Sequence, residues 1–191
     1  MLAAGYLLKR IAPPPDWLGA GENRIEDICS VSACVNADVV DVQNAWQHNG
    51  FGLANRPDIL TSLAAETAIS VDGARLFYYT AYEREIASDG WSFDAASWRP
   101  RSRARSAGVD DAVQEPGDDD ALSLMGYDVV VFGDYLEHSP LSCNSVAANL
   151  PVNEHCLLSS REEAIEAIDA GAFGGGCEEG VYTIFAVYRV G

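Results

Sequence analysis

The sequence predicts an α+β fold: a mixed, mainly antiparallel sheet of about five strands, with two or three helices packed on it and one long charged loop. Three observations carry this prediction. Apolar runs of strand length lie near both ends and in the middle of the chain, segments with helical spacing lie between them, and one stretch poor in apolar residues interrupts the pattern. With 191 residues, the chain is long enough for a single domain over residues 1–191.

The first quarter of the chain predicts a strand followed by a short helix. Residues 5–12 predict a short strand that must end at Pro13, because three consecutive prolines supply no hydrogen-bond donors to a sheet. Ile25 and Ile28 have helical spacing, and Asn23 is a suitable N-cap before them.

A second helix and a second strand follow. Pro57 suits the first turn of a helix, and Asp58 complements the positive end of the helix dipole. The apolar positions from 59 to 67 trace one helical face. Residues 76–82 are apolar or aromatic on both alternating faces, which is typical of a strand covered on both sides.

Residues 88–122 predict a mobile charged loop or insertion rather than a domain boundary. Arginine occupies alternate positions from 99 to 105, and acidic residues dominate from 110 to 120. Since few apolar residues lie between 109 and 121, burial cannot offset the entropy lost on ordering this stretch.

The last third predicts a strand at 127–135, a shorter strand at 151–158, a helix, and a final strand at 181–190. Ser160 and Glu163 have the spacing of a capping box that opens the helix. No internal repeat is visible in the sequence.

Charge is distributed unequally between the two halves. Residues 1–105 carry 13 acidic and 10 basic side chains, whereas residues 106–191 carry 16 acidic and 2 basic ones. The net charge of −17 is therefore concentrated in the second half. Such a field repels nucleic acid and anionic membranes and speeds encounters with cationic partners.

An acidic surface is the first candidate site. Glu162, Glu166 and Asp169 have the spacing of one exposed helix face without a balancing lysine, an arrangement that mildly disfavours the helix and leaves room for a cationic partner. Trp91 and Trp98, where the chain leaves the sheet for the charged loop, are candidate interface anchors if exposed, because tryptophan is enriched at binding hot spots. The full partner-binding set comprises Asp118, Asp119, Asp120, Glu162, Glu166, Asp169, Glu178, Glu179, Trp91 and Trp98.

A cluster of thiols and imidazoles is the second candidate site. His138, Cys143 and His155 lie within one short segment. A histidine within hydrogen-bond reach of a cysteine activates its thiol as a nucleophile. Cys143 with His155 or His138 as its base is therefore the candidate catalytic pair.

We expect neither a metal nor a cofactor. His155 and Cys156 are adjacent, so on a strand they would point to opposite faces, and the chain has no Cys-x-x-Cys motif. The triplet from Gly174 to Gly176 lacks the lysine and hydroxyl residue that follow in a phosphate-binding loop.

Localisation follows from composition. No apolar run approaches the ~18 residues that a membrane span requires. Five cysteines without framework spacing favour free thiols in a reducing compartment, and the first positive charges follow the apolar start, unlike those of a secretory signal. These features predict a cytoplasmic protein without a membrane or nucleic-acid partner; the oligomeric state is left open.

These observations favour a non-enzymatic acidic protein that neutralises a basic protein partner such as a toxin, in the manner of a bacterial immunity or inhibitor protein. The alternative is a small thiol-dependent enzyme that uses Cys143 with His155 or His138.

Overall fold

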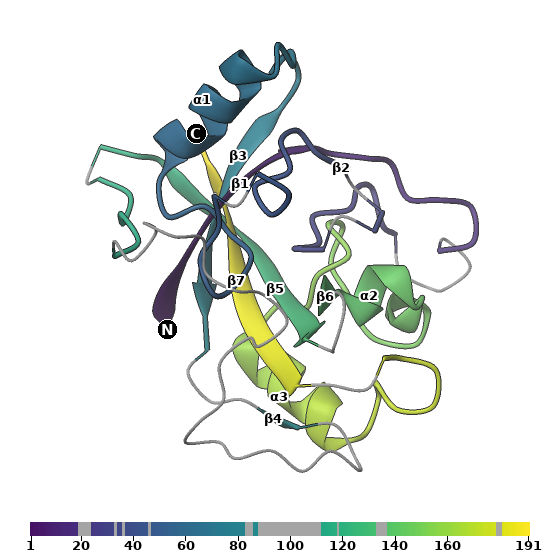
Figure 1. The fold of residues 1–191 in the computed structure, drawn as a ribbon. Helices are drawn as coiled ribbons and strands as arrows, with labels where there is room; N and C mark the ends of the chain where they lie inside the picture. The colour runs from purple at the N-terminus through teal and green to yellow at the C-terminus, as the bar shows by residue number, and fades with distance from the viewer. Residues whose placement is uncertain are drawn as a thin grey trace.

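The computed structural model confirms the α+β class (Figure 1). It describes residues 1–18, 24–32, 34–35, 37–45, 47–82, 86–87, 112–117, 119–132, 137–178 and 181–191. The strands form one sheet in the order β2-β1-β3-β7-β5-β6, with β4 also paired to β7, and every pairing among the described strands is antiparallel. The long strands are β1 (Leu2–Arg10), β3 (Arg75–Ala81), β5 (Leu122–Phe132) and β7 (Val181–Val190); the two-residue strands are β2 (Ala37–Asp38), β4 (Ile86–Ala87) and β6 (Glu137–His138).

Two longer helices lie at opposite ends of the curled sheet (Figure 1). Helix α1 (Pro57–Glu66) packs on β1, and α3 (Arg161–Asp169) packs on β5 and β7. A short helix α2 (Pro140–Cys143) and a 3₁₀ turn η1 (Val146–Ala148) follow β6. The predicted cap of α3 is present, because the Glu163 N–H donates to the Ser160 hydroxyl oxygen over 3.1 Å.

The fold consists of two structural repeats, although no repeat was predicted from the sequence. Repeat A (residues 2–81) contains β1, α1 and β3 in that order, and repeat B (residues 122–190) contains β5, α3 and β7. Each repeat starts with a strand that bulges at a glycine of positive φ followed by a tyrosine, at Gly5 in repeat A and at Gly126 in repeat B.

A matching asparagine clamps each bulge. The Asn49 amide donates to the Ala4 carbonyl, just before Gly5, and its oxygen accepts the backbone N–H groups of residues 51 and 53. The Asn153 amide donates to the Met125 carbonyl, just before the second glycine, and its oxygen accepts the N–H groups of residues 155 and 157. The same hydrogen-bond pattern is therefore built twice, from different residues.

The two repeats are related by an approximate two-fold axis at the centre of the sheet. Gly5 is paired with Tyr79 on β3, and Gly126 is paired with Val187 on β7. These two partners are paired with each other where β3 meets β7. Because equivalent residues face each other there, the axis passes through this pair.

Two further expectations are corrected. Residues 25–32 form no helix; instead Ile28 makes an isolated bridge to Ala12, and this segment runs beside residues 154–155. Residues 151–158 form no regular strand, because Asn153 folds them into a turn whose last residue bridges to Tyr127. Most of the predicted loop at 88–122 lies outside the described residues; its predicted end coincides with the first residue of β5.

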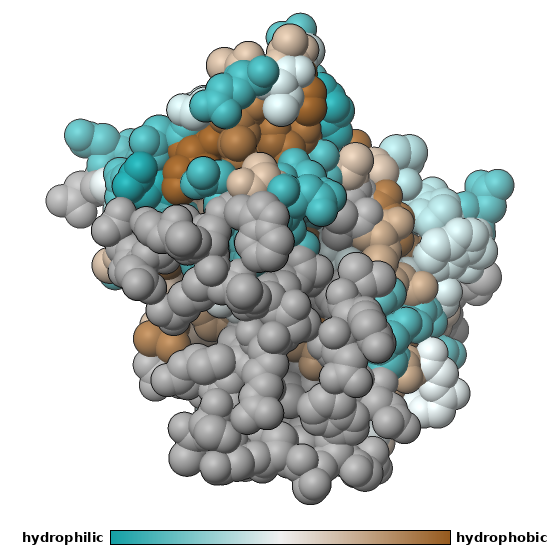
Figure 2. Space-filling view, in the orientation of Figure 1, coloured by the Kyte–Doolittle hydropathy of each residue, from teal (hydrophilic) through white to brown (hydrophobic). Residues whose placement is uncertain are grey.

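The apolar interior consists of two clusters. One lies between α1 and the β1–β3 half of the sheet, and the other joins α2 and α3 to β5 and β7. Figure 2 shows apolar surface gathered at the end of the molecule that carries α1, where Ile59 and Leu63 pack against the first cluster while remaining partly accessible. Among the described residues, no helix has the length and apolar character needed to cross a bilayer.

The glycine bulge provides a test of the fold. Gly126 has φ +144°, and a Cβ placed there would lie 2.7 Å from the Leu157 Cβ and 2.8 Å from the Leu158 carbonyl oxygen. We expect Gly126→Ala to lower the free energy of unfolding by about 3 kcal/mol or more, from backbone strain and steric overlap together. Urea unfolding measures the change.

Gly73→Ala is the matched control. Gly73 has φ +73°, but no atom lies within 4 Å of the added Cβ. Gly73→Ala should lower the free energy of unfolding by only about 1 kcal/mol, because alanine disfavours a positive φ. Equal losses in the two variants would show that the close approach at residue 126 does not matter.

Candidate functional site

The candidate site lies where the connecting segments of the two repeats meet. In each repeat, this segment runs from the first strand to the clamping asparagine. Residues 30–32 and 34 of repeat A lie against residues 138–143 of repeat B. A hydrogen bond between the Ser30 and Ser142 hydroxyls and one from the Ser32 N–H to the Ser139 Oγ, over 3.1 Å, join the two segments. The site therefore requires both repeats.

Two buried charged side chains hold one peptide segment beneath the site. Asp128 on β5 is fully buried, and its Oδ2 accepts from the Val31 N–H over 2.8 Å and from the Ser139 hydroxyl over 2.6 Å. Lys9 on β1 is also fully buried; its Nζ donates to the Val31 carbonyl over 2.9 Å and pairs with Asp38 over 2.6 Å. Both polar backbone groups of Val31 are thus fixed by charged side chains, one from each repeat.

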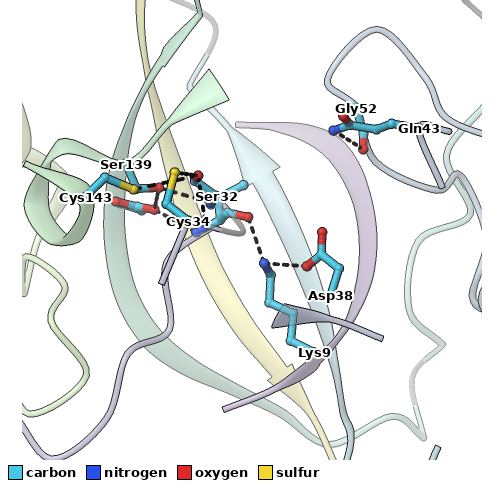
Figure 3. A network of polar contacts seen from close by, with 10 residues as sticks. Lys9, Ser32, Cys34, Asp38, Gln43, Gly52, Ser139 and Cys143 are labelled. Atoms are coloured by element: carbon cyan, nitrogen blue, oxygen red, sulfur yellow. Dashed lines mark hydrogen bonds and ion pairs between the residues drawn. The ribbon is translucent and has the colours of Figure 1, made fainter. Parts of the chain in front are cut away.

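Cys34 and Cys143 lie close together beside this anchor (Figure 3), and His138 joins them. The Sγ atoms of Cys34 and Cys143 and a ring nitrogen of His138 lie within 4.8 Å of one another. The Cys34 Sγ is 3.5 Å from the His138 Nδ1 and accepts a hydrogen bond from the Ser32 hydroxyl over 3.2 Å. Cys34 is exposed to solvent, whereas Cys143 is half-buried.

The contact between the two thiols makes them differ in acidity. The hydrogen bond from the Cys143 thiol is the largest cause that lowers the pKa of Cys34, to about 6, with further help from the Ser32 hydroxyl and the nearby His138. The same contact with Cys34 raises the pKa of Cys143, and burial raises it further. Of the two thiols, Cys34 is therefore the more acidic.

The structure brings together some of the predicted catalytic residues and separates others. Cys143 and His138 share the cluster described above, whereas the His155 Nδ1 lies 2.7 Å from Asp27 in a separate cluster that also contains Cys29. Cys34 was not predicted. It lies 104 residues before His138, in a segment that the sequence analysis assigned in part to a helix.

The predicted acidic residues that the structure describes are placed on separate elements. Glu162, Glu166 and Asp169 are exposed along α3, as their spacing suggested. Asp119 and Asp120 directly precede β5, whose first residue is paired with Val190 of β7, and Glu178 lies beside His138 at 3.6 Å. Asp118, Glu179, Trp91 and Trp98 lie outside the described residues.

Comparisons with protein-family models, with curated proteins and with solved structures found no match. The function is therefore argued from the side chains of this chain.

The buried Asp128 generates a prediction about stability. Burial raises its pKa to about 6, and an unfolded aspartate titrates near pH 4. Between these two values the native state holds a proton that the unfolded state lacks, so stability rises as the pH falls through this window. Protonation of Asp128 in this window raises the free energy of unfolding by about 3 kcal/mol.

Asp128→Asn should lack this gain, because the amide keeps an oxygen for Val31 and Ser139 but does not titrate. Urea unfolding from pH 7.5 to pH 4, on the native chain and on the variant, isolates the contribution as the difference between the two curves. Parallel curves would contradict a raised pKa at Asp128.

Proposed function

We propose that this chain is a thiol-dependent protein that exchanges the thiols of Cys34 and Cys143 with a disulfide of another molecule. The supporting observation is the juxtaposition of two cysteine sulfurs from different repeats, one exposed and one half-buried, beside the imidazole of His138. An exposed thiolate next to a protonated thiol is the pairing that thiol–disulfide exchange requires.

The exchange runs in two steps. The Cys34 thiolate attacks one sulfur of the incoming disulfide; an S–S bond forms at Cys34, and the other sulfur leaves as a thiolate. The Cys143 sulfur then attacks the Cys34 sulfur, and the second half of the disulfide departs with the proton of Cys143. The incoming disulfide has gained two electrons, and the two cysteines have lost them. His138 acts beside Cys34 as a positioning residue that favours the thiolate.

Thiol labelling tests the first step. At pH 6, Cys34 is half ionised, and a free cysteine thiol is almost entirely protonated. After allowance for the lower nucleophilicity of a more acidic thiol, iodoacetamide should alkylate Cys34 about ten times faster than free cysteine. Peptide mapping by mass spectrometry in the presence of a chelator identifies the site. A Cys34 rate equal to that of free cysteine would contradict the proposal.

Oxidised glutathione tests the second step on the same reduced protein. The native chain should end with a Cys34–Cys143 disulfide and no retained glutathione. Cys143→Ser should retain glutathione on Cys34, and Cys34→Ser should do neither. Cys177→Ser is the control, because Cys177 lies outside the cluster and its substitution should leave the exchange intact.

A second candidate function rests on the exposed acidic face of α3. Glu162 is paired with Arg161 over 2.7 Å, but among the described residues no basic side chain lies within ion-pair distance of Glu166 or Asp169. Uncompensated charge at i and i+3 on an exposed helix suits a basic protein partner.

Charge reversal tests the binding proposal. The double variant Glu166→Lys with Asp169→Lys should reduce capture of a basic protein from a lysate at low salt by about tenfold. Glu66→Lys with Asp72→Lys changes the net charge equally at exposed positions of repeat A and should have little effect. If the two double variants capture the same basic protein equally weakly, or if both still capture it fully, α3 is not the binding surface.

A further inference from the structure

We propose that Cys34, Cys143 and His138 bind a zinc ion, with the carboxylate of Glu178 as the fourth ligand. Two cysteine sulfurs, an imidazole nitrogen and a carboxylate oxygen are ligand types that zinc prefers, and four is its usual number of ligands in structural sites. The inference does not depend on thiol–disulfide exchange, since it requires only the positions of the side chains.

The distances around the His138 nitrogen match those of a tetrahedral site. Bond lengths of ~2.3 Å to sulfur and ~2.1 Å to nitrogen or oxygen place the ligand atoms of a tetrahedral zinc about 3.4 to 3.8 Å from one another. The Cys34 Sγ and the His138 Nδ1 are 3.5 Å apart, and the same nitrogen is 3.6 Å from the Glu178 Oε1. The Cys143 Sγ lies within 4.8 Å of the other cysteine and of the histidine nitrogen.

The second cluster of potential ligands does not match. In the group of Asp27, Cys29 and His155, the carboxylate Oδ1 and the imidazole Nδ1 are only 2.7 Å apart. That is a direct hydrogen bond, too short for two ligands of one tetrahedral ion, whose separation is about 3.4 Å. Geometry therefore selects the first cluster over the second.

The surroundings of the first cluster orient its ligands. The Ser32 hydroxyl donates to the Cys34 sulfur over 3.2 Å, and its oxygen lies 3.8 Å from the Cys143 Sγ. Hydrogen bonds of this kind fix the direction of metal ligands and tune their affinity. The exposed Cys34 leaves the site accessible from solvent.

Metal binding and disulfide formation compete for the same two sulfurs. In the zinc-bound form both sulfurs are thiolates that bind the metal, whereas in the disulfide form neither sulfur is a thiolate and neither can bind it. A thiol oxidant should therefore abolish metal binding, and bound zinc should slow alkylation of Cys34.

Cobalt titration of the reduced, chelator-treated full chain tests the proposal. One equivalent of Co²⁺ should produce the sulfur-to-cobalt charge-transfer band and the intense visible bands of a tetrahedral thiolate site, and Zn²⁺ should displace it. Cys34→Ser, Cys143→Ser and His138→Asn should each weaken zinc binding by more than about 100-fold, and Glu178→Gln by about tenfold.

Two controls make the result decisive. Cys177→Ser, next to the proposed fourth ligand, and His155→Asn, in the second cluster, should bind zinc as the native chain does, and circular dichroism checks that every variant is folded. Absence of the thiolate band, or unchanged affinity in Cys34→Ser, overturns the zinc site. Failure of the glutathione reaction with normal zinc affinity would overturn the exchange function instead.

Discussion

The organisation of the candidate site depends on two hydrogen bonds to the backbone of Val31. Lys9 donates to its carbonyl, and Asp128 accepts from its N–H. Burying a lysine and an aspartate is costly unless each is paired and hydrogen-bonded. Here Lys9 is paired with Asp38, and the Asp128 Oδ2 accepts from two donors; these bonds offset part of the cost for Asp128 and also fix the chain. Because Ser32 and Cys34 follow directly, their positions are set by this anchor.

The anchor also explains why the site lies between repeats rather than within one. Lys9 extends from the first strand of repeat A, and Asp128 from the first strand of repeat B. The segment that they hold belongs to repeat A, but the Ser139 hydroxyl bonded to Asp128 precedes Cys143 of repeat B. One carboxylate thus links the backbones that carry the two cysteines.

Much of the sheet could be predicted from local patterns. The strands around residues 6, 78, 129 and 185, the helix at Pro57 and the cap at Ser160 all follow from periodicity and end signals that operate over a few residues. The missed features depend on distant pairings. The clamps by Asn49 and Asn153 turn segments that lack strand or helix periodicity into ordered loops.

The site was predicted only in part for the same reason. His138 and Cys143 are close in sequence, so their association could be proposed from spacing alone. Cys34 joins them through contacts between the connecting segments of the two repeats, and no local signal distinguishes it from the other cysteines. The repeat escaped notice because equivalent positions share few identities: Gly-Tyr at residues 5 and 126, and asparagine four residues before leucine at residues 49 and 153.

The pairing of Tyr79 with Val187 gives the chain the geometry of an isologous dimer in which the two subunits are covalently joined. A dimer of identical chains must place the same side chain on both sides of its axis. Joined copies are free of that constraint: counted from the bulge glycines, Asp128 corresponds to Leu7, and Lys9 to Val130, all of them buried. The fusion thereby permits a basic group on one side and an acidic group on the other, an asymmetry unavailable to a symmetric pair.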